Sequence, residues 1–193
     1  MTVTIRPLAE SEWSAAMELT ARAFLYEPFI VGLLGADPVA RYPLCRDRYA
    51  CLEWDPDGDS LGAFSDGLLI GAVGVDRAGH CHQCHSADQP DFITGQISTY
   101  ARNVSAVHAK QEPAHGWVGR VAVEPSLHGN GIGGLLVAGA LEHLAERDTD
   151  MALLDAELHR VSYYEPWGFT VIEHFSGSVS NNLALMRWTS SGN

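Results

Sequence analysis

Positively charged side chains are scarce in this sequence. Twelve lysines and arginines stand against 24 aspartates and glutamates, which gives a formal net charge of -12 at pH 7. A surface of this sign repels phosphate backbones and anionic lipid headgroups, so neither nucleic acid nor a membrane is expected as a partner. An acidic surface suits a neutral or cationic small substrate, although it also serves solubility alone.

Long apolar runs are missing as well. No stretch approaches the roughly 20 residues that a membrane span needs. Met1 to Pro7 is typical of a strand, and it lacks the basic segment and apolar stretch of a secretion signal. Four cysteines without such a signal indicate reduced thiols. We therefore expect a cytoplasmic protein.

No internal repeat and no linker interrupts the 193 residues, so a single domain over 1–193 is expected. The spacing of apolar residues and the positions of glycine and proline predict a mixed α/β fold. Helices are expected over 10–24, 29–35, 38–54, 91–110 and 130–147, a short helical turn over 162–167, and strands over 2–7, 61–65, 68–75, 117–123, 151–156, 169–173 and 183–188.

The segment from Val118 to Val137 is the most informative part of the chain. It predicts a buried strand, a turn with four glycines in six residues, and then an apolar helix. Amides at such a turn lie at a helix N-terminus, where unpaired N–H groups and the helix dipole favour an anion. Glycine removes the Cβ atoms that would keep phosphates at a distance. The sequence therefore predicts a phosphorylated cofactor bound by the backbone.

A dinucleotide is one interpretation of this turn. Gly129, Gly131 and Gly134 satisfy the dinucleotide fingerprint, and Asp155 follows at a distance suited to a ribose contact. However, residues including Pro125 separate the strand from the glycines, and too little chain follows for a doubly wound sheet. An NAD(P)-binding oxidoreductase is therefore the less favoured alternative.

A second interpretation comes from three segments in order. Residues 121–136 resemble the acetyl-CoA-binding segment of the GCN5-related N-acetyltransferases, the GNAT family, with His128 in the place of that family's Arg or Gln. Residues 163–169 are similar to its aromatic-Tyr-Glu-x-x-Gly-Phe segment, and residues 23–28 resemble the first helix pair of a bacterial branch. The resemblance covers nearly the whole chain.

This resemblance implies an acyl-CoA N-acyltransferase fold, in which helices flank a splayed, mixed central sheet. Acetyl-CoA would lie between the strands over 117–123 and 151–156, with its pantetheine arm along the first strand. Arg160 stands where the family often has Asn. The expected cofactor contacts are Val121, Ala122, Val123, His128, Gly129, Asn130, Gly131, Ile132, Gly133, Gly134 and Arg160.

The resemblance also implies direct transfer of an acetyl group to a primary amine of a small molecule or peptide. Tyr164 would act as the general acid that protonates the leaving thiolate, although it could instead be a packing residue. The family's strand carboxylate is replaced here by Gly119, which leaves His115 and Glu27 as candidate bases. A non-catalytic acyl-CoA-binding module is the alternative function.

The amine is expected to bind beside the loop around Pro28, where a proline breaks a helix pair. Tyr26, Glu27 and Phe29 combine aromatic rings with a carboxylate, which suits a cationic amine that has an apolar body. A monomer or a homodimer is expected.

A dense group of soft ligands lies between His80 and His85, with Cys81 and Cys84 at zinc-knuckle spacing. A closed metal site usually needs a second, well-separated ligand pair, and Cys45 and Cys51 are not spaced as one. No metal is therefore expected.

Overall fold

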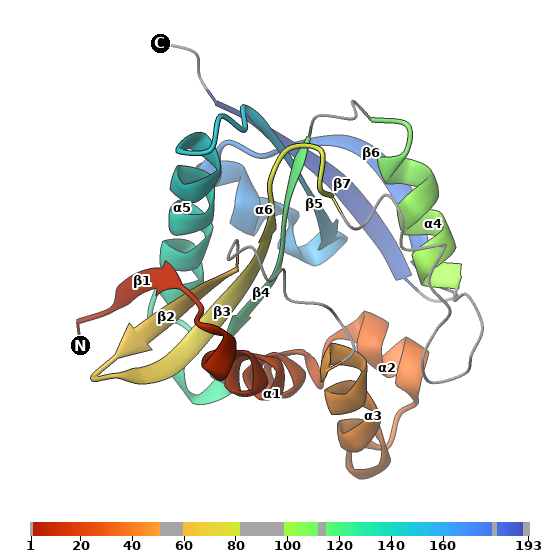
Figure 1. Ribbon diagram of the computed structural model, residues 1–193. Coiled ribbons are helices and arrows are strands. Elements are labelled where there is room, and N and C mark those ends of the chain that lie inside the picture. Colours follow the sequence, from red (N-terminus) through yellow and green to blue (C-terminus); the bar gives the residue numbers. More distant parts are fainter. Residues whose placement is uncertain (1, 51–59, 82–98, 112–114, 179–180, 191–193) are drawn as a thin grey trace. The chain divides into compact units, whose positions relative to one another are not determined.

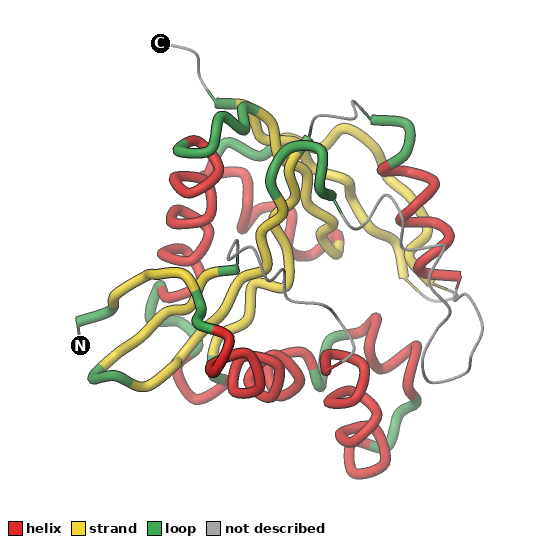
Figure 2. Tube along the Cα trace, in the orientation of Figure 1, coloured by secondary structure: helices red, strands yellow, loops and turns green. Residues whose placement is uncertain are grey.

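The computed structural model describes residues 2–50, 60–81, 99–111, 115–178 and 181–190 (Figure 1). Figure 2 separates its helices from its strands, and the mixed α/β content agrees with the sequence prediction. The helices are α1 Trp13–Phe24, α2 Pro28–Leu34, α3 Pro38–Ala50, α4 Thr99–His108, α5 Ile132–Ala145 and α6 Val161–Tyr164, with 3-10 turns η1 Glu10–Glu12, η3 Pro125–Leu127, η4 Leu158–Arg160 and η5 Glu165–Trp167. The strands are β1 Thr4–Pro7, β2 Leu61–Ser65, β3 Leu68–Asp76, β4 Gly116–Val123, β5 Met151–Glu157, β6 Thr170–Ser178 and β7 Asn181–Thr189.

The strands form a seven-stranded sheet in the order β1-β2-β3-β4-β5-β7-β6. β4 and β5 are parallel, and Gly116 pairs with Ala152 and Trp117 with Leu153. The pairs β1–β2, β2–β3, β5–β7 and β6–β7 are antiparallel. A mixed sheet with helical connections is therefore confirmed.

The chain divides into two compact units, each of which is described by itself. The first unit comprises Met1–Val75 and Val118–His143, and the second comprises Asp76–Trp117 and Leu144–Asn193. The expected single domain stays a prediction. Strand β4 and helix α5 each contribute residues to both units.

In the first unit, the β2–β3 hairpin turns at two residues with positive φ, Asp66 at 49° and Gly67 at 78°. An Asp-Gly pair favours this kind of turn, because both central residues must adopt left-handed backbone angles that match the twist of the strands. The expected hairpin is therefore present, and β3 extends one residue beyond its predicted end to Asp76.

Helix α1 uses two buried positions to join this hairpin to the other helices of the unit. Ala16 packs with Leu8 and the sheet residues Phe64 and Ala72. Ala21 lies five residues later on the helix and belongs to a second cluster, formed with Ile30, Cys45 and Tyr49 of α2 and α3. Burial of the Cys45 thiol raises its pKa to about 11, which keeps it protonated at neutral pH.

A buried arginine connects the C-terminal ends of α1 and α2. The Arg41 side chain is 2% exposed. Its Nε donates a hydrogen bond to the Leu25 carbonyl oxygen at 2.8 Å, and its Nη1 donates to the Gly35 carbonyl oxygen at 2.6 Å. These two carbonyls lie at the ends of α1 and α2, so one guanidinium satisfies both helix ends.

In the second unit, β5 pairs with β7 along its whole length, from Met151–Thr189 to Glu157–Leu183. Helix α4 lies alongside β6 (Figure 1), and its buried Val107 packs with Leu153 and Leu185. The expected helix over 91–110 corresponds to α4 in its described part, while residues 91–98 lie outside the described residues.

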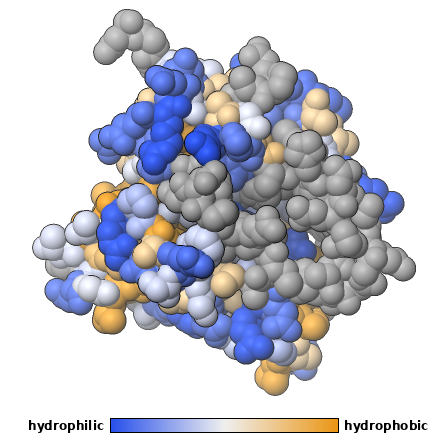
Figure 3. Space-filling model, in the orientation of Figure 1, coloured by the Kyte–Doolittle hydropathy of each residue, from blue (hydrophilic) through white to orange (hydrophobic). Residues whose placement is uncertain are grey.

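The surface carries scattered apolar side chains. Val39 on α3 is 81% exposed and Leu68 on the hairpin is 69% exposed. Figure 3 shows hydrophobic atoms on this face of the first unit in separate groups, over the β2–β3 hairpin and over the helices α2 and α3. Such isolated groups are ordinary for a folded chain. Among the described residues, no helix combines the length and the hydropathy of a membrane span.

Candidate active site

The turn between β4 and α5 is open where a phosphate would have to approach. Gly129 has φ 81° and Gly131 has φ 77°, and a Cβ built on either residue would meet no atom within 4 Å. Helix α5 begins at Ile132, so its first amides have no partner within the helix. The turn therefore combines left-handed backbone, empty space and helix N–H donors, which is the geometry of an anion site.

Two side chains of the same turn hold its backbone in shape. The His128 Nε2 donates to the Val123 carbonyl oxygen at 3.0 Å. The Asn130 Nδ2 donates to the Leu127 carbonyl oxygen at 3.0 Å. His128 and Asn130 are both exposed residues that the sequence assigned to the cofactor. That contact stays a prediction, and the structure shows that both side chains also shape the glycine turn.

The carboxyl end of β4 is anchored within the first unit. The Glu124 N–H donates to the Ile70 carbonyl oxygen at 3.0 Å, and its carboxylate forms a 2.8 Å ion pair with Arg22 of α1. Arg120 has φ 52° within the strand, and its guanidinium covers Gly74 of β3, where a Cβ would lie 2.6 Å from Nη2. A left-handed residue within a strand marks a local kink. The residues Val121 to Val123 thus lead from this kink to the glycine turn.

Tyr164 lies in the second unit, at the end of α6. Its ring makes edge-to-face contacts with Tyr163 at 5.0 Å and with Phe169 at 6.1 Å between centroids. Gly168 adopts φ 89°, which ends the segment as the sequence predicted. Burial raises the pKa of the neighbouring Tyr163, and Arg160 partly opposes this rise. The stack positions the Tyr164 ring, and the role of its hydroxyl as an acid stays a prediction.

The predicted amine-binding residues differ in exposure. Tyr26 is 71% exposed, and the Arg41 guanidinium lies 5.7 Å from its ring centroid. Glu27 precedes α2 in extended conformation and is half-buried. Phe29 packs edge-to-face on Phe24 at 6.4 Å within the helix cluster. The structure therefore leaves Tyr26 and Glu27 accessible at the loop, while Phe29 also contributes to the core of the first unit.

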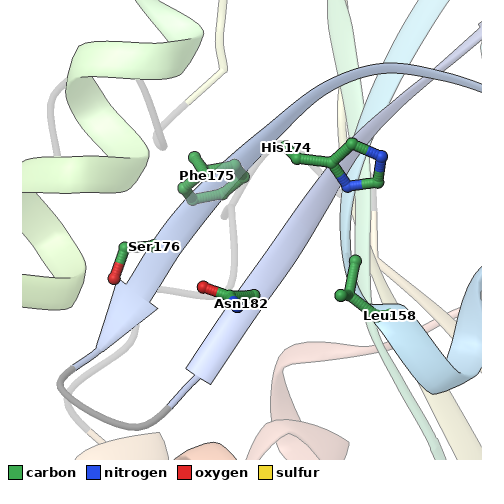
Figure 4. Close-up of a pocket in the computed structure, with 5 residues that line it drawn as sticks. All are labelled: Leu158, His174, Phe175, Ser176 and Asn182. Atoms are coloured by element: carbon green, nitrogen blue, oxygen red, sulfur yellow. The ribbon is translucent and has the colours of Figure 1, made fainter.

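A hollow of about 470 Å³ lies in the second unit. Leu158 lines it from the turn that follows β5, His174, Phe175 and Ser176 line it from β6, and Asn182 lines it from β7 (Figure 4). Figure 4 shows His174 and Leu158 on one side, with Ser176 and Asn182 near the end of the hairpin. Small-molecule sites have volumes of roughly 300 to 1,000 Å³. The sequence did not single out these residues, because their common feature is their place on the folded hairpin.

His115, a predicted base, lies immediately before β4 and is 1% exposed. Its ring centroid lies 5.6 Å from that of His108. One ligand atom of each ring lies within 4.8 Å of the Cys81 thiol. His108 also contacts Asp155. Sequence analysis missed this grouping because its members come from four separate segments. The role of His115 as a base stays a prediction that its burial does not favour.

The architecture and the glycine turn together describe a mixed α/β protein whose turn between β4 and α5 has the geometry of an anion site. The family model described as "Acetyltransferase (GNAT) family" matches residues 25–169. The chain belongs to this family and is an acyltransferase. The same match rejects the alternative interpretation of the chain as an NAD(P)-dependent oxidoreductase.

Solved structures show the same fold. A polyamine N-acetyltransferase of Drosophila melanogaster that forms N-acetylagmatine is similar with a TM-score of 0.71 and 16% identity, over 97% of this chain and 100% of that chain. A histone acetyltransferase HPA2-related protein of Corynebacterium glutamicum has a TM-score of 0.70 and 18% identity, over 100% and 99%. The PaiA N-acetyltransferase of Thermoplasma acidophilum, in complex with coenzyme A, has a TM-score of 0.60 and 16% identity, over 98% and 99%. No curated protein matches the chain significantly.

Proposed function

We propose that this protein transfers the acetyl group of acetyl-CoA to a primary amine of a small, cationic molecule. The observation that carries the proposal is the open turn at Gly129 and Gly131, which offers amides and space at the start of α5. A pyrophosphate fits such a turn, because it needs several N–H donors and no intruding Cβ.

The first part of the proposal concerns the co-substrate. The pantetheine arm would extend along β4 and accept hydrogen bonds from the backbone at Val121 and Val123, as an added strand would. The pyrophosphate would accept hydrogen bonds from the amides of Gly129 through Gly134. The coenzyme A complex of the Thermoplasma acidophilum relative supports this choice of co-substrate.

The second part concerns the chemistry. A neutral amine attacks the thioester carbonyl, a tetrahedral oxyanion forms, and the coenzyme A thiolate leaves. Tyr164 would donate its phenolic proton to the leaving sulfur. Glu27 would attract the protonated amine and take up one proton, directly or through water, which gives the neutral nucleophile. After the attack, the second proton on the nitrogen would pass to the Tyr164 phenolate and restore the acid. His115 has no part in this scheme, because its side chain is buried.

The third part concerns the acceptor. The net charge of -12 raises the local concentration of cationic substrates. Tyr26 and Glu27 provide an aromatic ring and a carboxylate at the α1–α2 loop. The Drosophila melanogaster relative acts on agmatine, which is a cationic primary amine.

The experiment is a thiol-release assay with acetyl-CoA against agmatine, a polyamine, an uncharged arylalkylamine and a lysine peptide. We expect release above the hydrolytic background, with a cationic small amine as the best acceptor. A chain that binds acetyl-CoA in calorimetry but releases no thiol with any amine would instead be the non-catalytic acyl-CoA-binding module. Preference for the lysine peptide would overturn the small-molecule assignment and leave the reaction intact.

A further inference from the structure

A buried group of metal-ligating side chains lies in the second unit. Cys81 follows β3 and is 5% exposed, His108 ends α4 and is fully buried, and His115 precedes β4 and is 1% exposed. One ligand atom from each residue lies within 4.8 Å of the other two.

The distance between Cys81 and His108 matches that of two ligands of one ion. The Cys81 Sγ lies 3.4 Å from the His108 Nδ1. In a tetrahedral zinc site, bonds of about 2.3 Å to sulfur and 2.0–2.1 Å to nitrogen place these two atoms about 3.6 Å apart. The His115 ring lies 5.6 Å from the His108 ring at an angle of 50°. One ligand atom of His115 also lies within 4.8 Å of those of Cys81 and His108, so the second imidazole belongs to the same group of ligands.

The far side of His108 carries the partner that metal-bound imidazoles usually have. Its Nε2 lies 3.0 Å and 3.1 Å from the two carboxylate oxygens of Asp155. The Trp117 Nε1 donates to the same carboxylate at 3.5 Å. A carboxylate at one ring nitrogen fixes the tautomer, so that the other nitrogen presents a lone pair to the metal. Here that other nitrogen is Nδ1, which faces the thiol.

We propose that Cys81, His108 and His115 bind one zinc ion, with Asp155 orienting His108 from behind. The ion would connect the end of α4, the chain after β3 and the start of β4 within the second unit. Thiolate and imidazole are the ligands that zinc prefers in proteins. His108 and His115 are a separated candidate ligand pair that the sequence alone did not reveal. The expected absence of a metal stays a prediction that the measurements below test.

The same atoms could instead form a Cys–His–Asp chain that activates a nucleophilic thiol. Two observations favour the ion. The thiol is 5% exposed, whereas a nucleophile must meet its substrate. The second buried imidazole, His115, has no task in a nucleophilic chain, but it is a third ligand in a metal site.

The first measurement uses the full chain without a polyhistidine tag, produced in medium that contains zinc. We expect mass spectrometry of the metal content to find about one zinc per chain. After removal of zinc, added Co²⁺ should give a thiolate-to-cobalt charge-transfer band and the intense visible bands of a tetrahedral site. At a hundredfold excess over its dissociation constant, zinc should raise the melting temperature by about 5–10 °C.

Variants then assign the ligands. Cys81→Ser should abolish the charge-transfer band and the stoichiometric zinc. Cys45→Ser is the matched control, because Cys45 is a fully buried thiol whose described partner is the Ala21 carbonyl oxygen. It should keep both signals. Asp155→Asn retains all three ligands and should weaken zinc binding about 10- to 100-fold in a chelator competition.

Several results would overturn the proposal. Zinc that is absent from the purified chain, together with no thiolate-to-cobalt band, would contradict it. Unchanged zinc affinity in Cys81→Ser would show adventitious binding by other side chains. If Cys81→Ser does not fold, the cobalt spectrum of the unmodified chain and the affinity of Asp155→Asn decide the question. Faster alkylation of Cys81 than of Cys45 in a folded, metal-free chain would support the nucleophile instead.

Discussion

The glycine turn of the first unit and the His108 cluster of the second are polar sites of opposite construction. At Gly129 and Gly131 the chain offers backbone groups, positive φ angles and empty space. At His108 it offers side chains, and the ring is fully buried against Asp155. The turn can exchange a ligand with solvent, as a co-substrate must, whereas the cluster suits an occupant that remains bound.

The difference shows how each site obtains its specificity. Backbone amides bind any group of the right charge and shape, so the surroundings of the turn would have to select the proposed acetyl-CoA. In the cluster, the identity and spacing of three side chains would select the proposed zinc ion. Substitutions should therefore act through shape at the turn and through chemical identity at the cluster.

The largest effect is expected from a substitution that fills the open space at the glycine turn. Gly131→Glu places a side chain and a negative charge where the pyrophosphate would bind, so it should abolish the thermal shift given by acetyl-CoA. In the unmodified chain, acetyl-CoA at a hundredfold excess over its dissociation constant should stabilise the fold by roughly 2.7 kcal/mol. Gly67→Glu is the control, because Gly67 also has positive φ and open space but lies in the hairpin. A full thermal shift in Gly131→Glu would reject the site.

The second largest effect is expected at Tyr164, the proposed general acid. Tyr164→Phe keeps the ring contacts with Tyr163 and Phe169 and removes the hydroxyl. The turnover number should fall about a hundredfold with little change in acetyl-CoA affinity, because general acid catalysis is worth that order. Tyr163→Phe removes a hydroxyl from the neighbouring, 40% exposed ring and should leave turnover within about twofold. Equal turnover in both variants at every pH would make Tyr164 a packing residue.

The third effect compares buried and exposed charge on one helix. Arg41→Met removes the donor to the Leu25 and Gly35 carbonyl oxygens, and urea unfolding should show a loss of about 2 kcal/mol. Arg46→Met on the same helix α3 should change stability by less than about 0.5 kcal/mol, because the Arg46 side chain is 52% exposed. A similar loss of stability in the two variants would show that the hydrogen bonds of Arg41 to the ends of α1 and α2 do not stabilise the fold.

The fourth effect concerns the acceptor. Glu27→Ala should lower the turnover number, because the amine loses its base. It should also raise the Michaelis constant for the amine by about fivefold and leave that for acetyl-CoA unchanged, because a half-buried charge pair is worth about 1 kcal/mol. Steady-state kinetics with each substrate varied in turn measure both constants. His174→Ala tests the hollow of the second unit in the same way. Unchanged amine kinetics in Glu27→Ala, with an increase in His174→Ala, would place the acceptor in the hollow.

The smallest expected effect is a pH-dependent change in stability that comes from the ion pair between Arg6 and Glu12. The hydrogen bond from Arg6 lowers the pKa of Glu12 from 4.5 to about 2. The pair therefore stabilises the fold above about pH 4.5, and this contribution is lost as the pH falls toward 2. Because Arg6 is 44% exposed, solvent screening limits the contribution to less than about 1 kcal/mol. Glu12→Gln should lower stability slightly at pH 7 and match the unmodified chain near pH 2, whereas an equal deficit at both pH values would contradict the pair.

Much of the fold followed from local signals in the sequence. Asp66 and Gly67 predicted the hairpin turn, Pro28 predicted the break between α1 and α2, and Gly168 predicted the end of the helical segment after β5. Each of these residues restricts or frees its own backbone, so its effect does not depend on distant contacts.

The candidate functional residues differ in the same way. The glycine turn could be predicted from the sequence, because its N–H donors are consecutive in the chain. The cluster could not, because Cys81 and His108 are 27 residues apart and His108 and Asp155 are 47 apart. Only folding of the second unit brings them together. His115 was noted as a titratable residue at the start of a strand, but its burial beside His108 could not be foreseen from sequence spacing.

Isothermal titration calorimetry of the unmodified chain with acetyl-CoA, and separately with NADH, tests the central claim most directly. Both ligands carry a pyrophosphate, so the comparison asks whether the turn between β4 and α5 belongs to an acyl-CoA site. We expect one acetyl-CoA bound per chain and no measurable heat from NADH. Absence of acetyl-CoA binding, or NADH binding of equal strength, would contradict the claim.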